Sequence, residues 1–142
     1  VLAWTRSGVP DDLPCEAREL DALLAESDVV SLHLALRPET RGLFDAARLG
    51  RMKPGAILIN TARSQIVDAQ ALVAALNSGQ IGHAGLDVFD TEPLPEDDPL
   101  IVLPNVTLTT HAAWYTREAG DRLLDLGFGI LDEELRRIET QG

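Results

Sequence analysis

The sequence is poor in cysteine, aromatic residues and long apolar runs. Its 142 residues include one cysteine, and aromatic residues make up 4% of the chain. Cys15 has no partner for an internal disulfide bond, which favours a reducing, cytoplasmic compartment. The low aromatic content argues against a surface that stacks nucleic-acid bases. No apolar run is long enough to span a bilayer, so we expect no membrane partner.

Positive charge is also scarce. Lysine and arginine total 12 against 23 acidic residues, which gives a net charge of -11. Such a surface repels phosphate backbones and anionic membranes, so we expect no nucleic-acid partner. At 45% hydrophobic, the chain has enough apolar material for a core, and its length suits about one domain.

What the sequence does contain is an alternation of strand and helix patterns. Apolar runs predict strands at residues 1–5, 29–34, 56–60, 83–89 and 106–110. Helical spacing predicts helices at residues 16–26, 46–52, 69–77 and 116–139. Alternation of this kind predicts an α/β fold with a parallel sheet and helices on both faces.

Three polar residues follow the carboxyl ends of three different predicted strands: Arg63, Glu92 and His111. Parallel strands place these ends on one edge of the sheet, where ligands bind in such folds. The three side chains are therefore expected to converge although they lie far apart in the sequence.

Together these residue types suit the oxidation of a hydroxyl group or the reduction of a carbonyl. Histidine, with an unperturbed pKa of about 6.5, carries a proton near neutral pH. A neighbouring carboxylate such as Glu92 favours the imidazolium form. Arg63 offers a planar fork that binds a carboxylate, so the substrate would be a small 2-keto or 2-hydroxy acid. The hydride requires a cofactor, because no side chain holds one.

Each residue also has a structural interpretation. Arg63 could form a surface salt bridge, Glu92 could be one solvated loop charge, and His111 could cap or pack in the core. A metal site is not expected, because the histidines lack partners at ligand spacing. The Gly-x-Ser-x-Gly elbow of a hydrolase is absent. Gly127 and Gly129 begin a dinucleotide fingerprint, but they lie inside a predicted helix and the fingerprint fails at Asp132.

Five ordered blocks resemble the D-isomer-specific 2-hydroxyacid dehydrogenase family. They are Ser27–Leu34, Met52–Ala56, Ile59–Arg63, Gly85–Phe89 with Glu92–Pro95, and Leu103–Val106 leading to His111. The resemblance covers nearly the whole chain. It implies an oxidoreductase that transfers a hydride between NAD(P)H and a small 2-keto acid or D-2-hydroxy acid.

The resemblance also implies a role for each site residue. Arg63 would bind the substrate carboxylate and carbonyl, His111 would be the general acid/base, and Glu92 would pair with it. Asp87 would contact the nicotinamide carboxamide. The backbone lining the nicotinamide would come from Thr61, Ala62, Ala112 and Ala113.

The family resemblance implies a Rossmann-like, doubly wound parallel sheet that is incomplete here. The first βα unit, which carries the glycine fingerprint, would be absent. Residues 1–115 would form part of the dinucleotide-binding domain, and residues 116–142 a long helix returning toward a missing substrate domain. Family members dimerise through the cofactor domain, so we expect a homodimer. We also expect these 142 residues alone to lack dehydrogenase activity.

The end of the first predicted strand bears on the choice of cofactor. NAD-preferring Rossmann domains usually place an acidic residue there to bind the ribose 2′-hydroxyl. This chain has Thr5, followed by Arg6 and Ser7. An uncharged residue beside arginine suits a 2′-phosphate, which favours NADP(H). The alternative is that Arg6 is only an exposed loop residue.

A second functional hypothesis comes from the residues after His111. The family often has Ile-Gly-Gly there, whereas this chain has Ala112-Ala113-Trp114-Tyr115, and Ser64 replaces the usual glycine after Arg63. Histidine followed by Ala-Ala-Trp-Tyr also resembles the C-terminal binding proteins, which are NAD(H)-sensing corepressors. A cofactor-sensing binding protein is therefore the alternative, and a catalytically silent relative is a third.

Overall fold

The structure is a computed structural model that describes residues 1–141, with side chains described for residues 1–138. It divides into two compact units, Val1–Thr110 and His111–Gly142. The predicted domain boundary after residue 115 stays a prediction.

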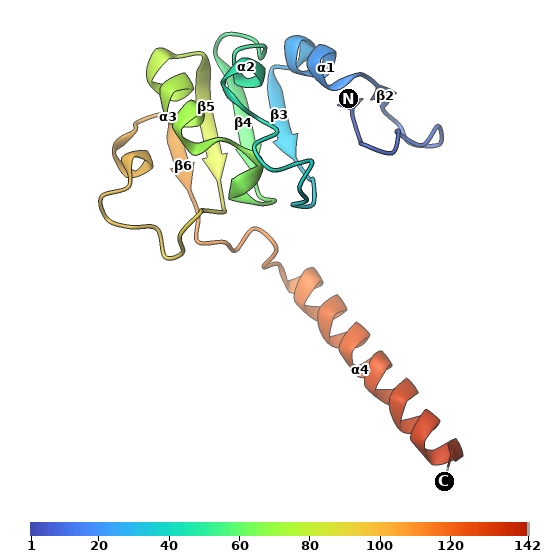
Figure 1. The fold of residues 1–142 in the computed structure, drawn as a ribbon. Helices are drawn as coiled ribbons and strands as arrows, with labels where there is room; N and C mark the ends of the chain where they lie inside the picture. The colour runs from blue at the N-terminus through green and yellow to red at the C-terminus, as the bar shows by residue number, and fades with distance from the viewer. Residues whose placement is uncertain (142) are drawn as a thin grey trace. The chain divides into compact units, whose positions relative to one another are not determined.

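The first unit contains two parallel sheets (Figure 1). The smaller sheet pairs β1 (Leu2–Ala3) with β2 (Glu16–Ala17). The larger sheet has the order β3-β4-β5-β6, and its strands are Val29–Leu32, Ala56–Asn60, Ile81–Leu86 and Val106–Leu108. All of its pairs are parallel. The predicted parallel α/β fold is therefore confirmed.

Helices connect these strands, and aspartate side chains cap α2 and α3. They are α1 (Leu20–Glu26), α2 (Ala46–Leu49) and α3 (Ala69–Ser78), with two 3₁₀ helices, η1 (Ser64–Ile66) and η2 (Pro99–Val102). The Asp45 carboxylate accepts the Arg48 N–H at 2.9 Å, and the Asp68 carboxylate accepts the Ala71 N–H at 2.8 Å. Helix α3 ends at Gly79, whose φ of 76° is left-handed and favours glycine.

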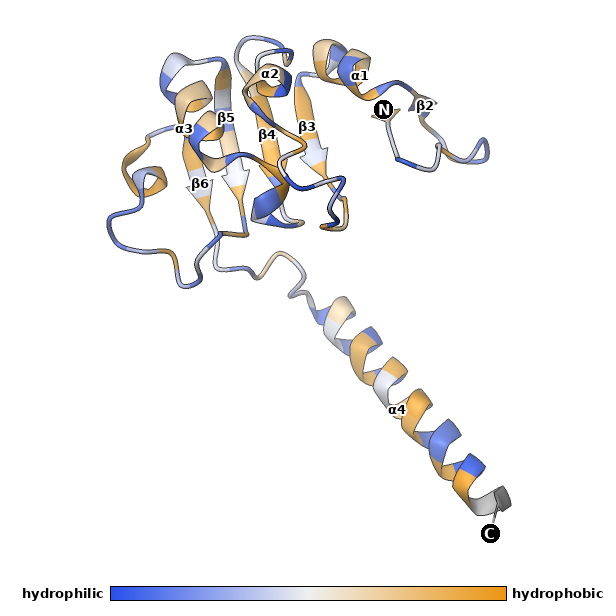
Figure 2. Cartoon of the chain, in the orientation of Figure 1, coloured by the Kyte–Doolittle hydropathy of each residue, from blue (hydrophilic) through white to orange (hydrophobic). Residues whose placement is uncertain are grey.

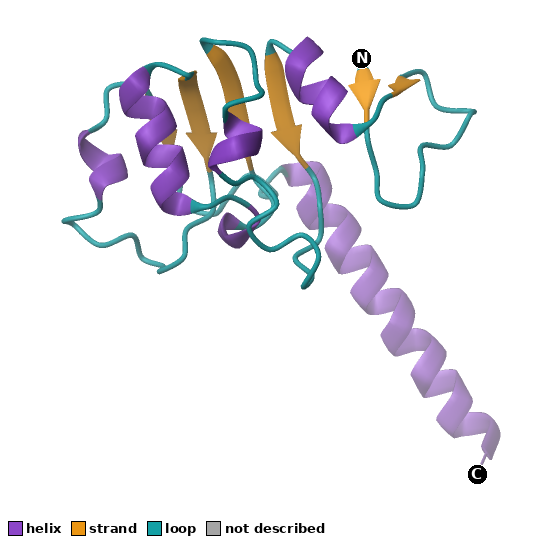
Figure 3. Ribbon diagram, turned by 45° about the horizontal axis from the view of Figure 1, so that its top comes forward, coloured by secondary structure: helices purple, strands orange, loops and turns teal. Residues whose placement is uncertain are grey.

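The hydrophobic core of the first unit lies between the larger sheet and helices α2 and α3, which cover one face (Figure 3). Alternate strand residues point into it: Val30, Leu32 and Leu58 are at most 4% exposed. On the opposite face Val29 is 52% exposed and Ile57 is 37% exposed. Figure 2 shows that hydrophobic residues concentrate in these strands.

The two sheets do not pair with each other. A groove of about 380 Å³ is lined by residues of β1 and β3 and by residues next to them. In parallel ladders successive residues offer their backbone groups to opposite sides. Val1 and Ala3 accept hydrogen bonds from the β2 segment, and Asp28 accepts one from Ile57 on β4. The backbone groups of Leu2 and Val29 therefore face the groove. They point away from β2 and β4, the strands with which β1 and β3 pair.

Several element boundaries differ from those predicted. The sequence predicted a helix over residues 16–26, but Glu16 and Ala17 form β2, and α1 begins only at Leu20. Pairing with β1 fixes β2, and this long-range contact leaves no local sequence pattern. Strand β5 ends at Leu86, so Asp87 follows the strand directly instead of lying within it.

The second unit consists of the segment from His111 and the long helix α4 (Arg117–Gln141). The Thr116 hydroxyl accepts the Ala119 N–H at 3.1 Å and caps its first turn. Ion pairs join Arg136 to Asp132 at 2.7 Å and Arg137 to Glu134 at 2.8 Å. Its large apolar side chains are more than half exposed: Leu123, Leu124, Leu126, Phe128, Ile130, Leu131, Leu135 and Ile138.

None of the helices in the described part of the chain combines the length and apolar character needed to cross a membrane.

Candidate active site

The carboxyl ends of β4 and β5 are joined through Asn60, a buried residue with 2% of its surface exposed. Its side-chain Nδ2 donates to the Arg63 carbonyl at 3.0 Å, and its Oδ1 accepts the Ala62 N–H at 3.1 Å. The backbone carbonyl of Asn60 accepts the Asp87 N–H at 3.0 Å. One buried residue therefore positions the backbone of three predicted site residues, Ala62, Arg63 and Asp87.

A groove of about 510 Å³ lies over the carboxyl ends of β3 and β4. Its lining includes Thr61, Ala62 and Arg63 from one strand end and residues 32–36 from the other. The Arg63 side chain is exposed, and its Nη1 donates to the Ala62 carbonyl at 2.6 Å. The groove thus contains exposed guanidinium donors beside backbone from two strand ends. This donor set fits an anionic substrate next to a bound nucleotide.

The two acidic residues predicted after β5 occupy different environments. Asp87 is 2% exposed, and its Oδ1 accepts the Thr109 hydroxyl at 2.5 Å. Glu92 lies in the exposed loop beyond, where its Oε1 accepts the Phe89 N–H at 3.0 Å. Asp87 therefore bonds with two neighbouring strand ends, and Glu92 accepts a hydrogen bond within its own loop.

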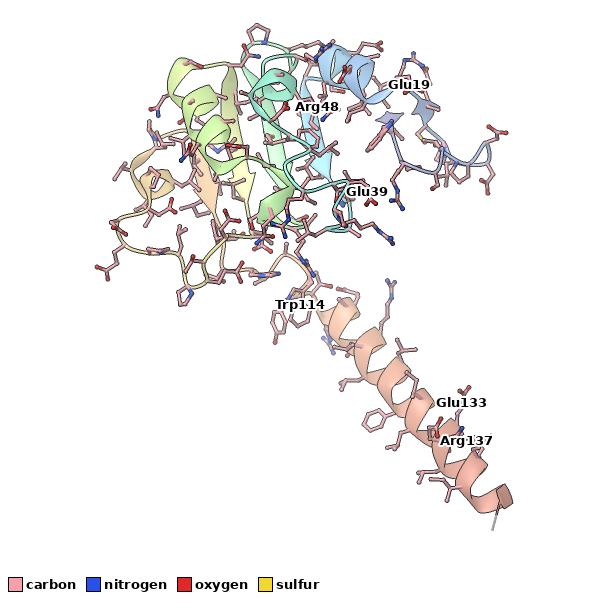
Figure 4. The ribbon with its side chains drawn as sticks, viewed as in Figure 1. Glu19, Glu39, Arg48, Trp114, Glu133 and Arg137 are labelled. Atoms are coloured by element: carbon pink, nitrogen blue, oxygen red, sulfur yellow. The ribbon has the colours of Figure 1, made fainter. Side chains whose placement is uncertain are left out.

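The predicted ribose-binding residues form a tight turn after β1. The Thr5 hydroxyl donates to the Gly8 carbonyl at 2.6 Å, and Gly8 has a left-handed φ of 88°. Arg6 forms an ion pair with Glu39, with 3.4 Å between Nη1 and Oε2. Ser7 is exposed in the same turn. Glu39 lies beyond the carboxyl end of β3 (Figure 4).

The remaining predicted residues belong to the second unit. His111 has a φ of 57°, a left-handed conformation that few residues other than glycine adopt and that is often found at active sites. The Ala112 carbonyl accepts the Tyr115 N–H at 2.9 Å, and Ala113 is exposed. The Trp114 and Tyr115 rings meet edge to face, with 5.4 Å between centroids. The convergence of His111 with Arg63 and Glu92 stays a prediction.

The sequence did not indicate every residue that builds this edge. No sequence pattern predicts a role for Asn60 or Thr109, although each hydrogen bonds with a predicted site residue or with its backbone. The available signal for Asn60 was its position as the one polar residue, at the end of an otherwise apolar strand. Among the described residues, no three His, Cys, Asp or Glu side chains gather closely enough to hold a metal ion.

Known proteins similar to this chain belong to the family that its sequence motifs resemble. The family model for the D-isomer specific 2-hydroxyacid dehydrogenase NAD-binding domain matches residues 1–113. A glyoxylate/hydroxypyruvate reductase B from Citrobacter koseri is 52% identical over 132 residues, which cover 87% of this chain and 41% of the relative.

Two solved structures are also similar. A D-isomer specific 2-hydroxyacid dehydrogenase from Xanthobacter autotrophicus Py2, in complex with NADPH and MES, is 44% identical with a TM-score of 0.72. The match covers 78% of this chain and 36% of that one. An NAD-complexed member from Lactobacillus delbrueckii ssp. bulgaricus is 36% identical with a TM-score of 0.75, over 83% of this chain and 40% of that one.

The chain therefore spans about two fifths or less of the length of these relatives. The family match, however, extends over most of its residues. This chain belongs to the D-isomer specific 2-hydroxyacid dehydrogenase family, and residues 1–113 correspond to its NAD-binding domain.

Proposed function

We propose that the complete protein containing these residues reduces small 2-keto acids to D-2-hydroxy acids with a nicotinamide cofactor. The groove lined by Thr61, Ala62 and Arg63 carries this proposal, because it presents arginine donors at the strand edge where α/β folds bind ligands. The Citrobacter koseri relative is a glyoxylate/hydroxypyruvate reductase B, and its name agrees with this chemistry.

In the proposed reaction Arg63 binds the substrate carboxylate through its planar guanidinium and polarises the adjacent carbonyl. The buried Asn60 amide holds the Arg63 backbone at the groove. A bound nicotinamide supplies the hydride, which no side chain holds. His111, as imidazolium, donates a proton to the substrate oxygen, and Glu92 is its proposed carboxylate partner.

For cofactor and assembly the proposal has two further parts. Arg6 beside the uncharged Thr5 favours NADP(H), because a guanidinium pairs well with a 2′-phosphate. The complete protein forms a homodimer, and residues 116–142 connect the cofactor domain with the substrate domain. The cofactor preference rests on the residues after β1, whereas the dimer and the connecting helix follow from the family resemblance.

The direct test is an assay of the complete protein with NADPH or NADH and four substrates: glyoxylate, hydroxypyruvate, pyruvate and a phosphoglycerate-derived keto acid. We expect oxidation of the reduced cofactor with at least one of them, and D configuration in any chiral product. Glycolaldehyde, which lacks the carboxylate of hydroxypyruvate, should react poorly because Arg63 has no anion to bind. Cofactor binding without turnover of any 2-keto acid would contradict the proposal and favour a cofactor-sensing protein.

A further inference from the structure

Glu39 lies opposite Arg6, the residue proposed to favour a 2′-phosphate. Their charged atoms are 3.4 Å apart, and their side chains are 61% and 53% exposed. The two residues come from different segments, beyond the carboxyl ends of β3 and β1. An acidic side chain thus faces the region where the cofactor ribose is proposed to bind.

Both charges are carried by loops with defined hydrogen bonds. Thr40, directly after Glu39, is 5% exposed, and its hydroxyl donates to the Ala35 carbonyl at 2.7 Å. The same hydroxyl accepts the Arg37 N–H at 2.8 Å. On the other side, the hydrogen bond between Thr5 and Gly8 closes the turn that carries Arg6. The approach of Glu39 to Arg6 therefore depends on two organised loops.

The two charges act in opposite directions on the cofactor. A guanidinium attracts a 2′-phosphate, whereas a carboxylate repels it and accepts hydrogen bonds from a ribose 2′-hydroxyl. The strand end that usually supplies this carboxylate has Thr5, whose hydroxyl donates to Gly8. Glu39 brings a carboxylate to the same corner from a different loop.

We propose that Glu39 is a cofactor-specificity residue that weakens 2′-phosphate binding at Arg6, so that the site accepts both NADH and NADPH. This inference rests on the proposed function, because it assumes that the β1 turn binds the cofactor ribose. It adds the residue that limits the preference for NADPH.

The test measures dissociation constants for NADH and NADPH in the complete protein by fluorescence titration. Glu39→Gln should tighten NADPH binding about fivefold and leave NADH binding unchanged or weaker, since one exposed opposing charge is removed. Glu39→Lys should move the ratio further in the same direction. Raising the salt from about 50 mM to about 500 mM should shrink both effects, because exposed charges are screened.

Glu19→Gln is the matched control. It removes the same charge from the start of α1, where the Glu19 side chain makes no capping hydrogen bond. Figure 4 shows Glu19 beside α1 and Glu39 at the other end of β3. The inference is overturned if Glu39→Gln and Glu39→Lys leave the NADH-to-NADPH ratio unchanged, or if Glu19→Gln shifts it equally. If the inference about Glu39 fails while the unaltered protein binds NADH and NADPH, the proposed function is not contradicted. If the unaltered protein binds neither nucleotide, the inference and the proposed function are both overturned.

Discussion

At the scale of single residues, Asn60 does the most to organise the carboxyl edge. Its side chain bonds with the backbone of Ala62 and Arg63, and its own carbonyl accepts the Asp87 N–H. A buried amide with both its donor and acceptor satisfied fixes neighbouring backbone strongly, because leaving either group unpaired is costly. Asn60 therefore acts as a positioning residue for Arg63.

Asn60→Ala should lower the free energy of unfolding by about 1–3 kcal/mol, because the Ala62 N–H and the Arg63 carbonyl lose their partner. It should also raise KM for the 2-keto acid more than it raises the dissociation constant of NADH. Denaturant unfolding and steady-state kinetics on the complete protein measure these effects.

Asn105→Ala provides the comparison. The Asn105 side chain also donates to a backbone carbonyl, that of Leu76 at 3.1 Å, but Asn105 lies before β6, away from the carboxyl edge. It should destabilise the protein without changing KM. Equal KM values in Asn60→Ala and the unaltered protein would show that Asn60 does not position Arg63 for substrate binding.

Sequence patterns indicated Arg63 and Asp87 through the blocks that contain them, but not the contacts around them. The hydrogen bond between Asp87 and Thr109 joins residues 22 positions apart. The ion pair between Arg6 and Glu39 joins residues 33 positions apart. Such contacts depend on how the strands are ordered in the sheet, which a single sequence does not specify.

At the scale of elements, locally encoded segments were predicted well. Strand β4 matches the apolar run of residues 56–60, and α3 begins at Ala69, the first residue of the predicted helix. The two-residue strand β2 was missed because both of its residues are exposed and its pairing with β1 leaves no periodic pattern. Elements with an apolar pattern of their own were therefore predictable. Strand β2, which forms only through backbone pairing with β1, was not.

Gly82 in β5 leads to a prediction about strand packing. A Cβ atom there would lie 2.4 Å from the Gly55 carbonyl oxygen, too close for any side chain. Gly82→Ala should therefore force the backbone apart and destabilise the protein by about 1–3 kcal/mol.

Gly85→Ala in the same strand is the control, because its Cβ would meet only Ile59 Cγ1, at the ordinary distance of 3.9 Å. Urea midpoints of the two variants should differ clearly, with Gly82→Ala the lower. Equal midpoints would mean that β5 and the Gly55 turn separate without cost.

At the scale of the whole molecule, the 142 residues contain one parallel α/β unit and a long helix in a second unit. The family match covers residues 1–113, whereas the similar proteins described above are more than twice as long as this chain's matched part. The groove between β1 and β3 separates two sheets whose strand edges face it.

Purified as residues 1–142 alone, the chain should therefore show no turnover of glyoxylate or hydroxypyruvate. Its strands do not form one continuous sheet, and the binding edge depends on strand ends in both sheets. A continuous assay with NADPH and NADH, run beside the complete protein, measures this. Turnover by the 142 residues at a rate close to that of the complete protein would show that these residues already contain all that catalysis needs, and would contradict the prediction.

The account depends most on His111 as the proton donor for hydride transfer. His111→Gln in the complete protein should lower kcat about 10²–10⁴-fold, because the glutamine side chain cannot act as a general acid near neutral pH. The dissociation constant of the reduced cofactor should change by less than about twofold, or about 0.4 kcal/mol, because His111 is proposed to donate a proton and not to bind the cofactor. His83→Gln is the matched control, because His83 hydrogen bonds with Thr107 within the sheet, at 2.9 Å.

The deciding measurement is thus kcat for 2-keto acid reduction in three proteins: unaltered, His111→Gln and His83→Gln. The account predicts a large loss in His111→Gln alone, with cofactor binding retained in all three. A His111→Gln protein that keeps its kcat within about tenfold of the unaltered protein would contradict the account, because proton transfer by a positioned side chain contributes more than that.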